Sequence, residues 1–144
     1  MTPRKVNGFM ALAAALFVAV MLGVMQRSGA DDGLDWKTNL AQATAQAKQA
    51  GKPLLVSFHS PDCIYCAKMD ATTFRDAKVQ ALAKQFVCVR VDSATAPQAT
   101  DAAKVAEFPT TIFLNSQGRE RFRAAGYIAP DRFAAVLSSF LATK

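Results

Sequence analysis

Apolar and polar residues alternate along the chain in segments whose spacing is typical of short helices and buried strands. Apolar positions at helical spacing over residues 36–50, with Asp35 as a candidate N-cap and Gly51 at the stop, predict a first helix. The unbroken apolar run 54–58 predicts a central parallel strand that is covered on both faces. Residues 63–70 predict a second helix after this strand.

The rest of the chain continues the alternation of helices and strands. In order, the expected elements are a helical piece capped by Asp76, a β-branched strand over 86–92, an Ala-rich helix ending near Val105, strands over 111–114 and 119–124, and an amphipathic helix from Pro130 or Asp131. The short turn at 115–118, with its glycine, joins the last two strands as a hairpin. The order predicts an α/β fold with a mixed central sheet of four or five strands and helices on both faces.

The N-terminus carries a segment of a different kind. Residues 9–25 are almost entirely apolar, two basic residues precede them, and Ser28-Gly29-Ala30 forms a small-x-small cleavage pattern. This segment predicts a cleaved signal peptide or a retained membrane anchor, and both would export the remainder. A buried helix of the fold is the third alternative. We therefore expect residues 1–30 to be a signal or anchor and residues 31–144 to be one domain.

Charge adds little to this interpretation. The formal net charge of +6 falls to +3 once the three basic residues of the N-terminal segment are removed. Three arginines alternate along one predicted strand and so share a solvated face, a weak hint of anion or membrane-surface binding; they are Arg119, Arg121 and Arg123. Nothing in this distribution indicates nucleic-acid binding.

Two of the three cysteines lie where a reactive thiol is expected. Cys63 and Cys66 stand at the junction of a buried strand and a helix, and the helix N-terminus favours a thiolate over a thiol. Cys63 would be the nucleophile and Cys66 the resolving thiol. Half of a zinc site and a structural disulfide are alternatives, although only His59 and the distant Cys88 could complete a zinc site. We expect Cys88 to fill the core.

These features together resemble the thioredoxin superfamily over residues 36–141. The resemblance rests on the element order, on Cys63-Ile64-Tyr65-Cys66 after the first strand and on Phe108-Pro109-Thr110 before the hairpin. Other segments are similar to exported thioredoxin-like domains, such as the C-terminal domain of the bacterial disulfide-reducing membrane transporter; they are Gly51-Lys52-Pro53, Lys68-Met69-Asp70 and the stretch from Thr73-Phe74 to Val79.

The resemblance implies a substrate site opposite the dithiol. Pro109 would be a cis-proline facing the cysteines, and the backbone of Phe108 would pair with an extended substrate strand. Thr110 and Tyr65 are counted with these two residues as substrate-binding positions, although Tyr65 could instead simply pack.

The sequence also departs from the thioredoxin pattern around the dithiol. Thioredoxins proper carry a buried aspartate where Ser57 stands and a tryptophan where Asp62 stands. Asp62 would oppose the Cys63 thiolate, whereas His59 would favour it when protonated, unless His59 is only structural. These changes affect the redox poise rather than the reaction class.

The sequence therefore predicts an exported thiol–disulfide oxidoreductase, most simply a reductase or an electron relay for protein disulfides. A disulfide oxidase or isomerase, and a non-catalytic module that binds peptides or copper, are the alternatives. The expected partners are protein disulfides, a redox donor or acceptor protein and, if the N-terminal segment is retained, the membrane. We expect a monomer, no cofactor and no resident metal.

Overall fold

One mixed sheet of four strands forms the centre of residues 33–143, the part of the chain that the computed structural model describes. Its strands are β1 (Leu54–His59), β2 (Val87–Asp92), β3 (Thr110–Leu114) and β4 (Glu120–Ala125). They lie in the order β2-β1-β3-β4; β1 is parallel to β2 and antiparallel to β3, and β4 is antiparallel to β3. The predicted mixed sheet and its hairpin are thus confirmed, with four strands.

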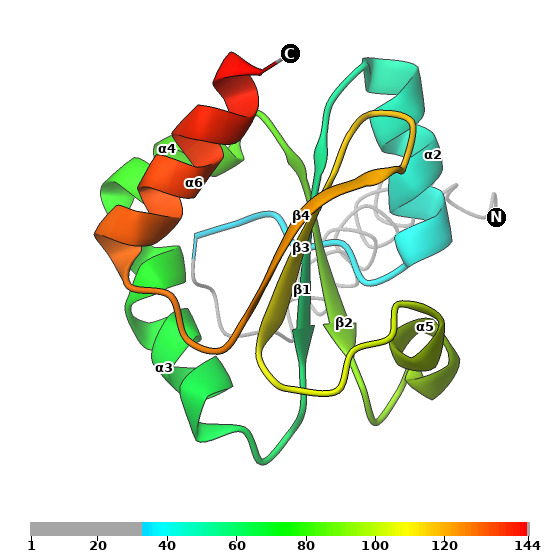
Figure 1. The fold of residues 1–144 in the computed structure, drawn as a ribbon, viewed down its shortest axis with the longest axis vertical. Coiled ribbons are helices and arrows are strands. Elements are labelled where there is room, and N and C mark those ends of the chain that lie inside the picture. Colours follow the sequence, from blue (N-terminus) through cyan, green and yellow to red (C-terminus); the bar gives the residue numbers. More distant parts are fainter. Residues whose placement is uncertain (1–32, 144) are drawn as a thin grey trace, which may run out of the picture. The chain divides into compact units, whose positions relative to one another are not determined.

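Helices cover both faces of this sheet, as Figure 1 shows. One face carries α2 (Leu40–Ala50) and α5 (Pro97–Ala102). The other carries α3 (Ile64–Ala71), a 3₁₀ turn (Thr73–Arg75), α4 (Ala77–Ala83) and α6 (Pro130–Ala142). The α/β class with two helical layers is confirmed.

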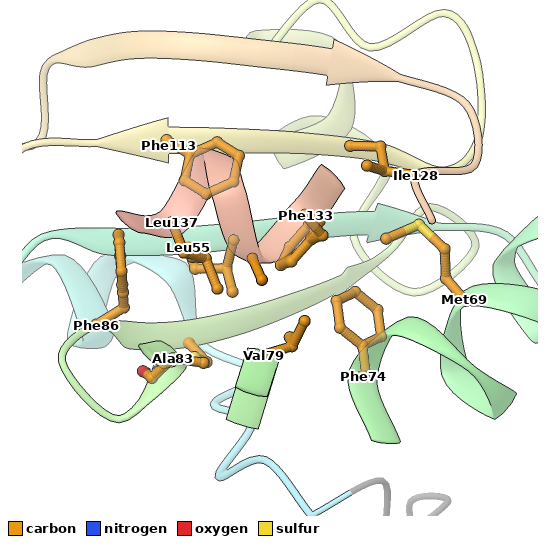
Figure 2. Packing of buried hydrophobic residues seen from close by; sticks show 12 residues of the cluster. Leu55, Met69, Phe74, Val79, Ala83, Phe86, Phe113, Ile128, Phe133 and Leu137 are labelled. Atoms are coloured by element: carbon orange, nitrogen blue, oxygen red, sulfur yellow. Dashed lines mark hydrogen bonds between the residues drawn. The ribbon is translucent and has the colours of Figure 1, made fainter. Parts of the chain in front are cut away.

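Strand alternation divides the buried residues into two apolar layers. Leu55 of β1 and Phe113 of β3 point to the side of α3, α4 and α6, where they belong to one buried cluster with Phe74, Phe133 and Leu137 (Figure 2). The apolar residues that alternate with these along β1 and β2 point to α2 and α5; they are Leu54, Val56, Phe58, Val87, Val89 and Val91. Because β1 is enclosed from both sides, its C-terminal end holds the following loop at a fixed position.

The first helix is shorter than predicted. It begins at Leu40, and Asn39 rather than Asp35 is its cap, with Asn39 Oδ1 accepting from the Gln42 N–H at 2.9 Å. The reason is that Lys37 forms a bridge to β2 instead of entering the helix: its N–H donates to the Cys88 carbonyl at 2.9 Å. The Ala-rich helix also ends early, at Ala102.

The predicted signal or anchor, residues 1–30, lies outside the described residues. Within residues 33–143, no helix has the length and apolar character needed to cross a bilayer.

Candidate active site

The two cysteines lie at the start of α3, directly beyond the C-terminal end of β1. Cys63 is the N-cap of α3, and its sulfur accepts a hydrogen bond from the Cys66 backbone N–H at 3.1 Å. The two residues form a disulfide, with Cα atoms 5.2 Å apart. Cys63 is half-buried and Cys66 is only 6% exposed. In the reduced state, the same N–H and the helix dipole would stabilise a thiolate on Cys63.

The residues between the cysteines face solvent. Ile64 is 82% exposed and Tyr65 is 58% exposed, which makes them the most exposed large apolar side chains among the described residues. Tyr65 therefore does not pack into the fold. The two side chains leave an apolar surface beside the more accessible sulfur.

The segment before β3 reaches the same end of the sheet. The Phe108–Pro109 peptide bond is cis, as the resemblance implied. Thr110 is paired with Phe58 in the antiparallel ladder, so Pro109 lies at the end of β1 from which the cysteine loop departs. The Thr110 side chain is buried and its hydroxyl donates to the Glu107 carbonyl at 2.7 Å. Any contact of Thr110 with a substrate would therefore come from its backbone.

A layer of polar side chains lies between this end of the sheet and α3, and sequence reasoning gave most of them no role. Arg90 of β2 donates to Asp70 of α3 at 2.7 Å, and its guanidinium stacks 4.5 Å from the Trp36 ring. Beside them, His59 Nε2 lies 3.7 Å from Asp92 Oδ2. Asp70 follows Cys66 by four residues, so its place on the same helix face was readable from the sequence. Its pairing with Arg90 of β2 could not be predicted from the sequence.

The pKa of the His59 imidazole lies below its ordinary value. Burial and, secondarily, the Arg90 guanidinium lower the pKa of His59, against the opposing charges of Asp92 and Asp70. The lowered pKa disfavours the protonated imidazole on which the predicted assistance to the Cys63 thiolate depends. Because the unfolded chain binds a proton more readily than the folded one, His59 contributes stability above pH 6.5 that is lost as the pH falls below it.

This titration can be observed directly, because His59 is the single histidine of the chain. We expect its ring proton resonance to titrate with a pKa below 6.5 in the folded protein and near 6.5 in urea. We also expect the decline in unfolding free energy just below pH 6.5 to be smaller in His59→Gln. A folded-state pKa at or above the unfolded value would contradict the assignment of burial as the main cause.

The third cysteine lies apart from this site. Cys88 is buried on β2, and its sulfur lies 3.7 Å from the Ala83 carbonyl, in keeping with a core position. Among residues 33–143, no group of three or more His, Cys, Asp and Glu side chains is arranged to hold a metal ion.

The three alternating arginines are exposed, as predicted, and Arg123 also makes specific contacts. It pairs with Glu120 at 2.6 Å and donates to the Ala103 carbonyl at 3.1 Å, which ties β4 to the end of α5.

Comparison with known proteins agrees with this geometry. Residues 40–141 match the model of a family described as thioredoxin-like domain. Among curated proteins, the chain is similar to the thiol:disulfide interchange protein DsbD of Ralstonia nicotianae, with 32% identity over 108 residues, and to that of Salmonella typhimurium, with 35% identity over 105 residues. These alignments cover 71% and 68% of this chain but only 18% of each relative.

Solved structures give the same fold. A thioredoxin from Thermus thermophilus superposes with a TM-score of 0.67 at 24% identity, covering 75% of this chain and 88% of that one. A structure titled DsbH oxidoreductase superposes with a TM-score of 0.61 at 23% identity, covering 76% and 83% of the two chains.

Proposed function

This chain belongs to the thioredoxin-like domain family, and on that premise we propose that it is an exported thiol–disulfide oxidoreductase whose redox centre is Cys63 and Cys66. One observation carries the proposal: the Cys63 sulfur caps α3, while Cys66 is enclosed one turn further along the same helix. The fold and the similarity to thiol:disulfide interchange proteins support this activity.

The two sulfurs divide the reaction between them. The Cys63 thiolate attacks one sulfur of a substrate disulfide, that S–S bond breaks, and the first substrate sulfur leaves with the electron pair and takes up a proton. Cys66 then loses its proton and attacks the Cys63 sulfur, which breaks the mixed disulfide and frees the second substrate thiol. The substrate gains two electrons and two protons, and the protein keeps the Cys63–Cys66 disulfide. No cofactor is needed for this exchange.

The proposed substrate is a protein segment held across the surface beside Cys63. Ile64 and Tyr65 would contact it through their exposed side chains, while Pro109 and the backbone of Phe108 and Thr110 would align its extended chain. The Cys-Ile-Tyr-Cys sequence is thus proposed to serve recognition as well as chemistry.

The direction of electron flow is proposed to be reducing. The N-terminal segment, residues 1–30, would carry the domain, residues 31–144, out of the cytoplasm, and a retained segment would hold it near a membrane electron donor. A dithiol that reduces substrates in an oxidising compartment must be reduced again by such a donor protein. The protein is therefore proposed to act as a monomeric reductase or relay rather than as a free oxidant.

Trapping of the mixed disulfide tests these roles. We expect the full chain with Cys66→Ser to accumulate a covalent adduct with a disulfide-containing protein, because the resolving thiol is missing. The Cys63→Ser chain should form no such adduct. In the reduced wild type, iodoacetamide should modify Cys63 about tenfold or more faster than Cys66 near neutral pH. Mass spectrometry measures both the adducts and the alkylation rates. Adducts that form only through Cys66 would reverse the assignment.

A further inference from the structure

His59 carries a buried ring nitrogen that the described structure leaves without a hydrogen-bond partner. Its Nδ1 atom is enclosed from solvent, and no donor or acceptor within residues 33–143 satisfies it. A buried polar atom left unpaired costs about 1–3 kcal/mol, so such an atom requires an explanation. The opposite ring nitrogen, Nε2, lies 3.7 Å from the Asp92 carboxylate. An imidazole with Nε2 facing a carboxylate favours the tautomer with its proton on Nε2, which leaves Nδ1 as an acceptor.

The strand pattern places the His59 ring in the layer beneath α3. Side chains alternate along β1, so His59 shares a face with Leu55 and Ser57. Leu55 belongs to the same apolar cluster as Met69 of α3. Cys66 precedes Met69 by one helical turn, is buried as Met69 is, and so faces the same layer.

The Asp70–Arg90 contact fixes which part of α3 lies over which part of the sheet. Arg90 is paired with Ser57 in the parallel ladder, and Asp92 is paired with His59 two residues further along. That step advances about 6–7 Å toward the C-terminal ends of the strands.

Helix α3 runs back from this end of β1 along the sheet (Figure 1). From Asp70 to Cys66 is four residues back toward the start of α3, about 6 Å in the same direction. Since Asp70 contacts Arg90, the matching step brings Cys66 to the level of His59 and Asp92 along the strand direction.

We infer that His59 Nδ1 is the proton acceptor for the Cys66 thiol in the resolving half of the exchange. This inference rests on the function proposed above. The Cys66 proton passes to Nδ1, the Cys66 sulfur attacks the Cys63 sulfur, and the leaving substrate sulfur departs with the electron pair of the broken bond. His59 then returns its proton to that sulfur or to solvent. In the disulfide form Cys66 has no proton to donate, which explains why Nδ1 is unpaired there.

The charges around His59 suit this task. The groups that act on it are Arg90 and Asp92 of β2 and Asp70 of α3. Burial and Arg90 keep the ring neutral and ready to accept a proton, while the two carboxylates stabilise the imidazolium once it forms. Ser57, which precedes His59 by two residues on the same face of β1, carries a hydroxyl that cannot accept a proton in this way.

A two-step reaction with 5,5′-dithiobis(2-nitrobenzoate) separates the two thiols. All variants are full chains that carry Cys88→Ala, which removes the third sulfur. Cys63 attacks the reagent and releases one thionitrobenzoate in a phase that depends on reagent concentration. Cys66 then releases the second in a phase that does not. The first phase tests the proposed function, and the second tests the role of His59. A wild type that never releases thionitrobenzoate through Cys63 would refute the proposed function itself.

We expect His59→Gln to leave the first phase unchanged and to slow the second by roughly 10²-fold near pH 7, the lower end of the usual contribution of a general base. Below the pH at which the free thiol ionises, the wild-type rate of the second phase should stay level. It should decline only when the pH is low enough to protonate His59. The rate in His59→Gln should instead fall about tenfold per pH unit across this range, because the fraction of thiolate falls by that factor. A second phase with the same rate and pH profile in the wild type and in His59→Gln would overturn the inference.

Two further measurements separate proton transfer from packing. Thr111, which is paired with Ser57 and so lies on the same face of the sheet as His59, has an enclosed hydroxyl without a hydrogen-bond partner. Thr111→Val removes this hydroxyl with little change in volume, and it should leave the second phase unaltered. An equal slowing in this control would overturn the inference. In the wild type, reduction of the disulfide should shift the ¹⁵N resonance of Nδ1 as it gains a hydrogen bond. An unchanged resonance would also overturn it, even if His59→Gln failed to fold.

Discussion

Replacing Cys63 with serine is expected to abolish disulfide reduction by the full chain, with a loss of about 10³-fold or more in turnover. The Cys63 sulfur is half-buried at the helix start, where the Cys66 N–H donates to it at 3.1 Å. A serine oxygen would accept the same hydrogen bond and keep α3 capped, so the fold should survive the change. A hydroxyl at this position is not ionised near neutral pH and does not attack disulfides. Insulin reduction with dithiothreitol as the electron donor measures the loss.

Cys88→Ala is the matched control for this experiment. It removes a sulfur from the core rather than from the start of α3, so turnover should remain within about twofold of wild type while stability falls by about 1 kcal/mol. Titration of the reduced chain with Cu(I) tests the binding-module alternative. Tight stoichiometric copper binding in a wild type that never reduces insulin would contradict the proposed enzyme.

The sequence predicted the sheet and most helices because their signals are local. An unbroken apolar run marks β1, and Asp76 caps α4 through its side chain as predicted. Asp35 failed as a cap because the choice between Asp35 and Asn39 depends on a tertiary contact. Lys37 is drawn into a bridge with β2, some fifty residues away in sequence, and the helix can begin only after that bridge.

The site, like the fold, was predictable only where its signals are local in the sequence. The dithiol and Pro109 are visible in the sequence because motif and strand context lie within a few residues of each other. The polar layer behind the dithiol was not, because Arg90 and Asp70 come from different elements and look like ordinary surface charges when each is considered alone. Only the fold brings them to 2.7 Å and places His59 beside them. The groups that we propose to take part in proton transfer are therefore the ones that a local sequence pattern reveals least.

Phe113→Ala is expected to destabilise the folded chain by about 3–5 kcal/mol, the usual range for a buried phenylalanine. Phe113 is 0% exposed on β3 and belongs to the buried layer drawn in Figure 2. Its ring centroid lies 5.7–6.2 Å from those of four other rings, which are Phe86, Phe122, Phe133 and Phe140. Truncation opens a cavity between β3, α6 and the end of α4 that these rings cannot fill. Because domains of this size are stable by only about 5–15 kcal/mol, the loss would take a large part of the total.

Phe122→Ala is the matched control, since it removes the same side chain from the neighbouring edge strand. Phe122 is paired with Phe113 in the ladder but is 43% exposed, so its loss should cost about 1 kcal/mol. Urea unfolding of the disulfide form of each variant, followed by tryptophan fluorescence, gives the midpoints and slopes. Equal losses of unfolding free energy in the two variants would show that burial of Phe113 against α6 is not a main source of stability. A larger loss for Phe113→Ala would locate the stability of the domain in the layer that also supports α3 and its dithiol.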